Sequence, residues 1–344
     1  MESGKRNAVK GFALGLTVVC TVACSQTKFT DGSLGKLDVP TGPQQEQFDF
    51  NDSNAQAKVD ILIVDDNSAS MLERQQKMAA RMGPFIATLG NIDWQIGITT
   101  TDTSDGPWGI KGSFIDLKGA TGNVLSRYTP NYGDVFKATI VRDETANCPN
   151  PDAICPSSDE RPLQAIVEAI GKRNTDNVGF FRDSASLAVI ILSDEDESYA
   201  LAPNIPVPPQ MVVNTVRAVF GPNKTFATYG IINRPEDQTC VEANTLNSGD
   251  RHPSIYAEEL IKLTGGVTGS VCDTDYVTAL SAIGKSLSTN ASSITLRGLP
   301  IPESVKIKIE PYDPDLTYVL SGSQIIFNHL PKKGTRVTVE YIAH

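Results

Sequence analysis

A short run of oxygen-bearing side chains directly follows an apolar segment near residue 60. Residues 59–64 are almost entirely apolar, and Asp66, Ser68 and Ser70 follow them at alternate positions. One carboxylate and two hydroxyls are hard oxygen donors of the kind that Mg²⁺ and Ca²⁺ prefer. Because hydroxyl ligands leave much of the cation's charge unneutralised, a metal held in this way could still recruit an oxygen atom from a partner molecule.

The segments around this run alternate between strands and helices. Continuous apolar runs predict strands that are buried on both faces, and apolar residues at helical spacing predict helices between them. We expect strands at 59–64, 94–99, 187–192, 225–232 and 269–272, and helices at 71–89, 162–170, 211–219, 255–263 and 276–288. This alternation predicts an α/β fold with a mostly parallel sheet, in which ligands bind at the carboxyl ends of the strands.

The Asp-x-Ser-x-Ser sequence in this setting resembles the metal-ion-dependent adhesion site of von Willebrand factor A-type (VWA) domains. The resemblance covers about residues 58–288 and includes the strand before the motif, the helix after it and the order of later elements. It implies a three-layer α/β/α, doubly wound, Rossmann-like fold that holds a divalent cation, Mg²⁺ first, with Ca²⁺ or Mn²⁺ as alternatives. Without that context, the same residues would predict a polar cap at the start of a helix.

The resemblance implies two further metal ligands. The family supplies a Thr from the loop before a later helix, and Glu160 stands at the matching position; Asp194 matches the family's Asp at the end of the next long buried strand. A glutamate adds negative charge, so the cation would attract a partner carboxylate less strongly. The alternative is that Glu160 is a solvated acid at the helix start, and that the cation uses Asp159, Ser158 or water.

Three further acids, Glu195, Asp196 and Glu197, follow Asp194 directly. The family does not require them. They could bind a second cation or extend into solvent, and we expect them to be solvated.

The amino terminus has the features of a bacterial lipoprotein signal. Basic residues precede residues 11–23, which carry no charge and are too few to span a bilayer as a helix. The sequence Thr21-Val22-Ala23-Cys24-Ser25 resembles a lipobox, although Leu is usual where Thr21 stands. We therefore predict a signal peptide over 1–23 and a lipid on Cys24; an ordinary cleavage after Ala23 or an uncleaved anchor are the alternatives.

Four cysteines remain once the signal peptide and the lipidated residue are set aside. An even number in an exported protein indicates two disulfides. We expect the pairs Cys148–Cys155 and Cys240–Cys272, although other pairings are possible from the sequence alone. A zinc site is the rival interpretation, but the sequence has no CxxC pair and only 3 histidines.

Two segments flank the predicted VWA domain. Residues 24–57 are polar and predict a flexible tether. Residues 289–344 switch to a period of two and predict a small antiparallel, β-sandwich-like domain.

The composition narrows the possible functions. A formal net charge of −10 argues against a nucleic-acid partner. The sequence shows no catalytic motif, so we do not expect an enzyme. We expect a lipid-anchored adhesion protein of the bacterial envelope, located at the outer membrane on its periplasmic face or at the cell surface. It would capture a protein or extracellular-matrix-like partner through its metal. The alternative is a periplasmic assembly or docking factor that uses the same domain without surface exposure.

Overall fold

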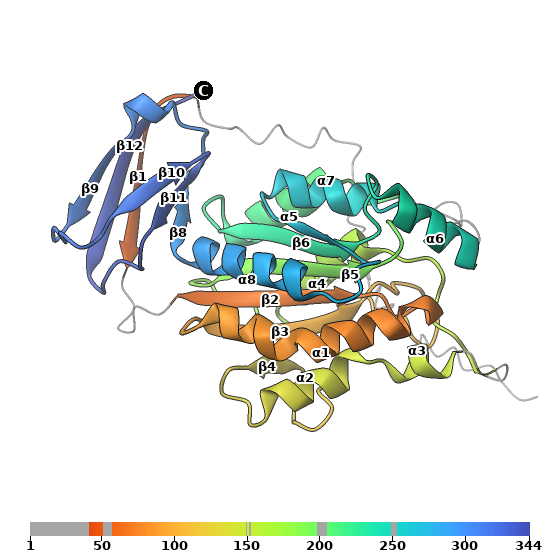
Figure 1. Cartoon of the computed structure of the whole chain (residues 1–344). Helices are drawn as coiled ribbons and strands as arrows, with labels where there is room; N and C mark the ends of the chain where they lie inside the picture. The colour runs from red at the N-terminus through yellow and green to blue at the C-terminus, as the bar shows by residue number, and fades with distance from the viewer. Residues whose placement is uncertain (1–40, 51–56, 149, 151–152, 198–204, 249–252) are drawn as a thin grey trace, which may run out of the picture. The chain divides into compact units, whose positions relative to one another are not determined.

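A six-stranded sheet forms the centre of the larger domain in this computed structural model, which describes residues 41–50, 57–148, 150, 153–197, 205–248 and 253–344. The strands lie in the order β4-β3-β2-β5-β6-β7 (Figure 1). Neighbouring strands are parallel, apart from the antiparallel pair β3 and β4. The strands are β2 (Lys58–Asp65), β3 (Asp93–Thr100), β4 (Val124–Ser126), β5 (Ser186–Ser193), β6 (Phe226–Ile232) and β7 (Thr268–Ser270).

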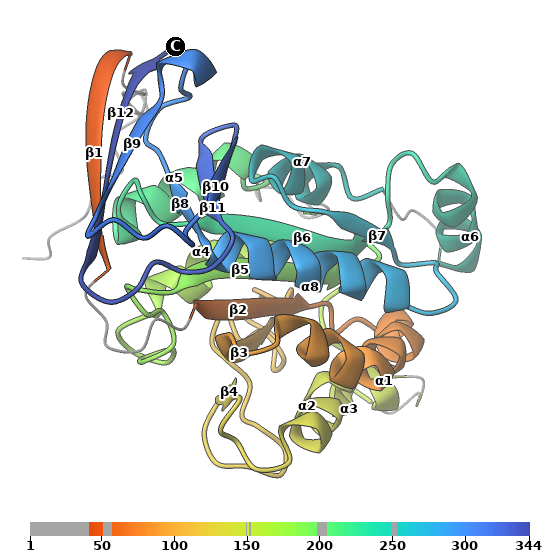
Figure 2. The ribbon, with the colours of Figure 1, turned by 60° about the vertical axis from the view of Figure 1, so that its left-hand side comes forward.

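Helices cover both faces of this sheet and complete three layers (Figures 1 and 2). One face carries α1 (Leu72–Leu89), α2 (Tyr132–Ile140) and α8 (Val277–Ala291). The other carries α4 (Pro162–Gly171), α5 (Pro209–Phe220) and α7 (Ile255–Leu263). The connections contain α3 (Asp143–Asn147), α6 (Gln238–Ser248) and the 3₁₀ turn Ala69–Met71.

The central strand β2 shows why the apolar runs form this sheet. Ile61 and Ile63 pack on the side of α1 and α8, whereas Leu62 and Val64 pack on the side of α4 and α5. All four side chains are fully buried. A strand that is covered on both faces needs apolar residues at successive positions. The predicted α/β fold class is therefore confirmed.

The smaller module contains two three-stranded antiparallel sheets, in the orders β1-β12-β9 and β10-β11-β8. Its strands are β1 (Gly42–Phe50), β8 (Ser293–Thr295), β9 (Lys306–Glu310), β10 (Tyr318–Ser321), β11 (Gln324–Phe327) and β12 (Thr335–Ala343), with a 3₁₀ turn at Pro302–Ser304. The prediction that residues 24–57 form a tether throughout is wrong at β1. That strand pairs with β12 from Gly42 opposite Ala343 to Phe50 opposite Thr335.

A buried acid explains why the polar segment at β1 forms a strand. Glu46 is the buried residue of β1, and its carboxylate accepts hydrogen bonds from the Tyr341 hydroxyl and from the backbone N–H of Arg297, the latter at 2.9 Å. Phe48 and Phe50 pack against the core of the module. Burial raises the pKa of the Tyr341 hydroxyl to about 12, which keeps it protonated and able to donate.

A buried ion pair lies in the first half of β2. Asp60 accepts hydrogen bonds from the backbone N–H and the Nε of Arg182, both at 2.7 Å, and Arg182 also pairs with Asp93 at 3.0 Å. Burial raises the pKa of Asp60 from 3.8 to about 6, because it outweighs the attraction of Arg182. Keeping the Asp60 carboxylate ionised in the folded chain therefore costs free energy.

This shift predicts a pH dependence of stability. The pKa of Asp60 is higher in the folded chain, so its contribution to the free energy of unfolding is fully present below about pH 4 and is lost as the pH rises through about 6. A shift of about 2 units corresponds to a loss of about 3 kcal/mol. Urea unfolding of the metal-free wild type and of Asp60→Asn measures the free energy of unfolding of each protein from about pH 4 to about pH 7. Over this range, the value for the wild type should fall by about 3 kcal/mol relative to the value for the variant.

Comparing the two proteins removes the contribution of the other buried acids, which the variant retains. A difference in unfolding free energy that stays constant from about pH 4 to about pH 7 would contradict the prediction.

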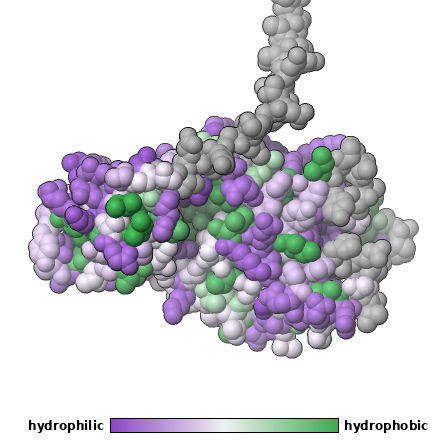
Figure 3. Space-filling model, turned by 90° about the horizontal axis from the view of Figure 1, so that it is seen from above, coloured by the Kyte–Doolittle hydropathy of each residue, from purple (hydrophilic) through white to green (hydrophobic). Residues whose placement is uncertain are grey.

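Both predicted disulfides are present in the structure, Cys148–Cys155 and Cys240–Cys272. The predicted signal peptide and Cys24 lie outside the described residues. Within the described ranges, no helix is both long and apolar enough to cross a bilayer. Apolar residues lie scattered among hydrophilic ones on the face shown in Figure 3, as is usual for a protein surface.

Candidate metal centre

The candidate centre lies where two neighbouring parallel strands end. In the register of the sheet, Asp65 of β2 lies opposite Leu192 of β5. Asp66 and Asp194 follow these strands at the same edge, and the backbone N–H of Asp66 donates to the Leu192 carbonyl at 2.9 Å. The parallel pairing therefore brings together two carboxylates that are far apart in the sequence.

The two serines connect these carboxylates through hydrogen bonds. The backbone N–H of Ser68 donates to Asp66 Oδ1 at 2.8 Å, and the hydroxyls of Ser68 and Ser70 lie 3.1 Å apart. The Ser70 hydroxyl donates to Asp194 Oδ1 at 3.1 Å. Four of the five residues predicted as metal ligands thus form one contiguous group.

Two residues of this group were missed by the sequence analysis. Ser193, the last residue of β5, donates its hydroxyl to Asp66 Oδ2 at 2.7 Å. Arg74 forms an ion pair with Asp194, with Nη2 3.3 Å from Oδ2. The sequence could have predicted Arg74 to lie beside the centre, because it is four residues after Ser70 and therefore on the same face of the helical segment.

Glu160 reaches the same edge through the backbone of its loop. It forms an isolated antiparallel bridge with Asp102, which follows β3, and the N–H of Arg161 donates to the Thr101 carbonyl at 3.1 Å. Pro162 then begins α4, as is favourable at the first turn of a helix. Glu160 is 1% exposed, so the alternative in which it is a solvated acid is wrong.

The carboxylate of Glu160 is an orphan. Both of its oxygen atoms are buried without a hydrogen-bond partner. Glu195 lies nearby, and a protonated Glu160 could donate a hydrogen bond to it, whereas two ionised carboxylates cannot hydrogen-bond to each other. Burial, followed by the negative charge of Asp66, raises the pKa of Glu160 well above 4.5.

The electrostatics of the centre favour a bound cation. Burial, followed by the negative charge of Asp194, raises the pKa of Asp66 to about 7. Acids are thus held close together in a buried region, which costs free energy unless positive charge compensates. A cation bound here would place positive charge beside the orphan oxygens of Glu160.

The donor set fits a hard cation but is not a cage of carboxylates. Within the described residues, the structure shows no group of three or more histidine, cysteine, aspartate or glutamate side chains that could hold a metal. Here the hydroxyls of Ser68 and Ser70 supply two of the oxygen donors, and Arg74 engages Asp194. The residues that would hold a cation are Asp66, Ser68 and Ser70, with Asp194 and Glu160 beside them.

We expected the three acids after Asp194 to be solvated, and this prediction is wrong for Asp196 and Glu197. Asp196 accepts hydrogen bonds from the backbone N–H groups of Tyr256 and Ala257 at the start of α7, at 2.9 and 3.2 Å. Glu197 accepts from the N–H of Leu163 at the start of α4, at 2.7 Å. Both acids are buried. They satisfy the free N–H groups of two helix starts and carry the favourable charge there.

Glu195 has a different position from the two acids that follow it. It is half-buried, and its negative charge raises the pKa values of Asp66 and Glu160. Its backbone carbonyl accepts a hydrogen bond from the Ser254 hydroxyl at 3.0 Å, and its backbone N–H donates to the Ser193 hydroxyl at 3.0 Å. It therefore adds negative charge at the rim of the centre.

No family model and no curated protein matches this chain. Among solved structures, it is similar to proximal thread matrix protein 1 from the mussel byssus, in a form with a zinc-occupied MIDAS motif, with a TM-score of 0.38 and 15% identity over 71% of this chain and 50% of that one. The chain thus spans about half the length of that protein.

Two further solved structures are similar to this chain at comparably low TM-scores. The human COPII-coat protein Sec24c gives a TM-score of 0.37 and 11% identity over 88% of this chain and 42% of that one. The pilus adhesin SpaC from Lactobacillus rhamnosus GG, in its open conformation, gives 0.30 and 10% over 88% and 41%.

Proposed function

We propose that this chain is a VWA-type adhesion protein that binds a divalent cation at the Asp66 centre and uses it to hold an oxygen-bearing group of a protein or matrix partner. One observation carries the proposal. The fold places Asp66, Ser68, Ser70 and Asp194 in one hydrogen-bonded group at a strand edge, beside the orphan carboxylate of Glu160.

Each residue would have a distinct part in this function. Asp66 contributes a buried carboxylate whose orientation is fixed by the Ser68 N–H and the Ser193 hydroxyl. Ser68 and Ser70 contribute neutral oxygens. A bound cation would supply a Lewis-acidic position for an oxygen atom of the partner. Mg²⁺ is our first candidate, with Mn²⁺ and Ca²⁺ as alternatives.

The cellular setting is part of the same proposal. The lipobox-like sequence at Cys24 supports a lipid anchor, and a lipid on that residue would hold the folded chain at the bacterial envelope. We place the protein at the outer membrane and assign it a binding role without catalysis.

Calorimetric titration tests the metal site directly. The protein should be the chain from residue 25 onward, which keeps every described residue, including β1. After chelation and dialysis, Mg²⁺ and Mn²⁺ should each bind with a stoichiometry of one. The metal should raise the melting temperature, because it binds the folded chain. Absence of saturable binding of Mg²⁺, Mn²⁺ and Ca²⁺ would refute the proposed function.

A further inference from the structure

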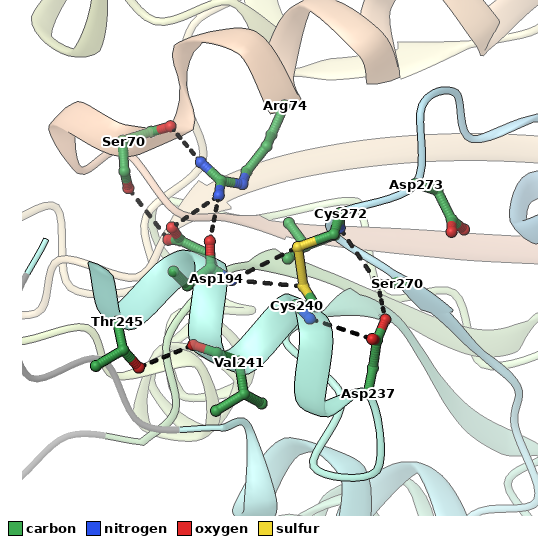
Figure 4. Close-up of a disulfide and its surroundings, with 12 residues drawn as sticks. Ser70, Arg74, Asp194, Asp237, Cys240, Val241, Thr245, Ser270, Cys272 and Asp273 are labelled. Carbon is green, nitrogen blue, oxygen red and sulfur yellow. Dashed lines mark hydrogen bonds and ion pairs between the residues drawn. A yellow bond between two sulfur atoms is a disulfide. The ribbon is translucent and has the colours of Figure 1, made fainter. Parts of the chain in front are cut away.

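Arg74 contacts the candidate metal centre from α1. Its Nη1 donates to the Ser70 carbonyl at 2.6 Å, and its Nη2 lies 3.3 Å from Asp194 Oδ2 (Figure 4). The Asp194 side chain is fully buried, and the Arg74 side chain is mostly buried. A guanidinium does not lose its charge at any physiological pH. A permanent positive charge therefore lies against a carboxylate that the cation would use.

A second element holds the guanidinium in this position. Nη2 of Arg74 donates to Asn244 Oδ1 of α6 at 2.7 Å. Asn244 is 3% exposed, and its Nδ2 lies 3.5 Å from the sulfur of Cys240 and 3.9 Å from that of Cys272. The Cys240–Cys272 disulfide ties α6 to the segment after β7. Arg74 is thus fixed from two sides.

Both oxygens of Asp194 are engaged in this arrangement. Oδ1 accepts a hydrogen bond from the Ser70 hydroxyl at 3.1 Å, and Oδ2 pairs with Arg74. A divalent cation that uses Asp194 must share the carboxylate with Arg74, and it must approach against the repulsion of the guanidinium. Arg74 would then stabilise the metal-free centre relative to the loaded one.

We infer that Arg74 is a built-in competitor for Asp194, held in place by Asn244 of α6, and that it lowers the affinity of the centre for divalent cations. This inference rests on the proposed metal-binding function. It makes Arg74 a positioning residue and not a ligand. Arg74 contacts Asp194, the Ser70 carbonyl and Asn244, and Asp66 has its own hydrogen bonds from the Ser68 N–H and the Ser193 hydroxyl, so the effect should be on affinity and not on the existence of the site.

The test is a titration with Mn²⁺ as the probe, using the chain from residue 25 onward. Arg74→Gln should bind Mn²⁺ on the order of tenfold more tightly than the wild type, because a nearby positive charge is removed. Asn244→Ala keeps the charge but frees the guanidinium to move away, so it should bind more tightly by a smaller factor. A general loss of structure would weaken binding instead.

Arg81→Gln is the matched control. Arg81 lies on the same helix and forms a half-exposed ion pair with Asp275 at 3.3 Å. Its substitution removes the same charge from α1 without removing a contact to the centre, and Mn²⁺ affinity should change much less than in Arg74→Gln. Thermal melting of each metal-free variant confirms that it is folded.

The outcomes separate this inference from the proposed function. If Arg74→Gln binds Mn²⁺ as tightly as the wild type or more weakly, the inference about Arg74 is overturned, but the proposed metal site is not. If neither protein binds Mn²⁺, the inference and the proposed function both fail. If Arg74→Gln does not fold, Asn244→Ala decides, and affinity equal to or weaker than that of the wild type in this variant overturns the inference.

Discussion

Replacing Asp66 by Asn should abolish measurable binding of divalent cations while the chain stays folded. Asp66 lies at the end of β2, is fully buried, and is oriented by the Ser68 N–H and the Ser193 hydroxyl. Removing its charge from a buried centre should weaken metal binding on the order of 100-fold or more. Calorimetric titration of the variant with Mg²⁺ and Mn²⁺ measures this loss.

The fold should tolerate this substitution because asparagine has nearly the same shape. Its amide oxygen can still accept from the Ser68 N–H, and its amide nitrogen can donate to the Ser193 hydroxyl. The change also removes a buried negative charge beside Asp194, so the metal-free variant should melt no lower than the metal-free wild type.

Asp134→Asn provides the control for the Asp66 variant. Asp134 is an exposed acid in the first turn of α2, 3.7 Å from Lys137. Its substitution removes one formal charge from the chain but none from the centre, and metal affinity should be unchanged. Metal binding retained in folded Asp66→Asn would show that the cation uses another site.

The fold and much of the centre were predictable because they depend on local patterns. Strands covered on both faces need successive apolar residues, so β2 and β5 are visible in the sequence. Parallel pairing then places whatever follows each strand at one edge. Asp66 and Asp194 come together in this way, even though Ser193, the last residue of β5, is 127 positions after Asp66 in the sequence.

The strand β1 could not be predicted from its own residues. Its partner β12 lies at the other end of the chain, and its buried residue is a glutamate whose contacts come from Tyr341 and Arg297. A polar edge strand has no apolar run to mark it, so only long-range pairing distinguishes it from a tether. A protein prepared for metal titration should therefore begin at residue 25, because a chain that begins at residue 57 lacks β1.

The roles of Asp196 and Glu197 could not be predicted from the sequence either. Each caps a helix that is distant in sequence, with partners at Tyr256 and Leu163 respectively. A sequence shows an acid in the first turn of its own helix, but it does not show an acid that is brought to a helix start by tertiary packing. The run of acids after Asp194 therefore resembles a solvated cluster in the sequence, although two of its members are buried.

Glu160 variants should change metal affinity and metal-free stability in opposite directions. The wild-type carboxylate is buried, and both of its oxygens lack a hydrogen-bond partner. Glu160→Gln removes its charge with little change in shape, so the metal-free protein should gain about 1–3 kcal/mol in free energy of unfolding. The same variant should bind Mn²⁺ on the order of tenfold more weakly, because it lacks a carboxylate ligand.

Two further substitutions separate the charge of Glu160 from its oxygen atoms. Glu160→Thr introduces a neutral hydroxyl in place of the carboxylate, so it should weaken metal binding yet leave a cation that captures a partner carboxylate more readily. Glu160→Ala should weaken metal binding without that gain, and the cavity that it leaves should offset part of any increase in stability. Acetate binding to the Mn²⁺-loaded proteins measures the capture of a carboxylate.

The paired measurements decide what the orphan carboxylate does. If Glu160 is a metal ligand, its buried carboxylate lowers the free energy of unfolding of the metal-free protein and raises that of the metal-bound protein. The increase in this free energy at saturating Mn²⁺ should then be larger in the wild type than in each of the three Glu160 variants. A helix-start acid without a metal role would change stability alone. Equal Mn²⁺ affinity in the wild type and in Glu160→Ala would therefore show that Glu160 is not a ligand, whatever happens to the metal-free stability.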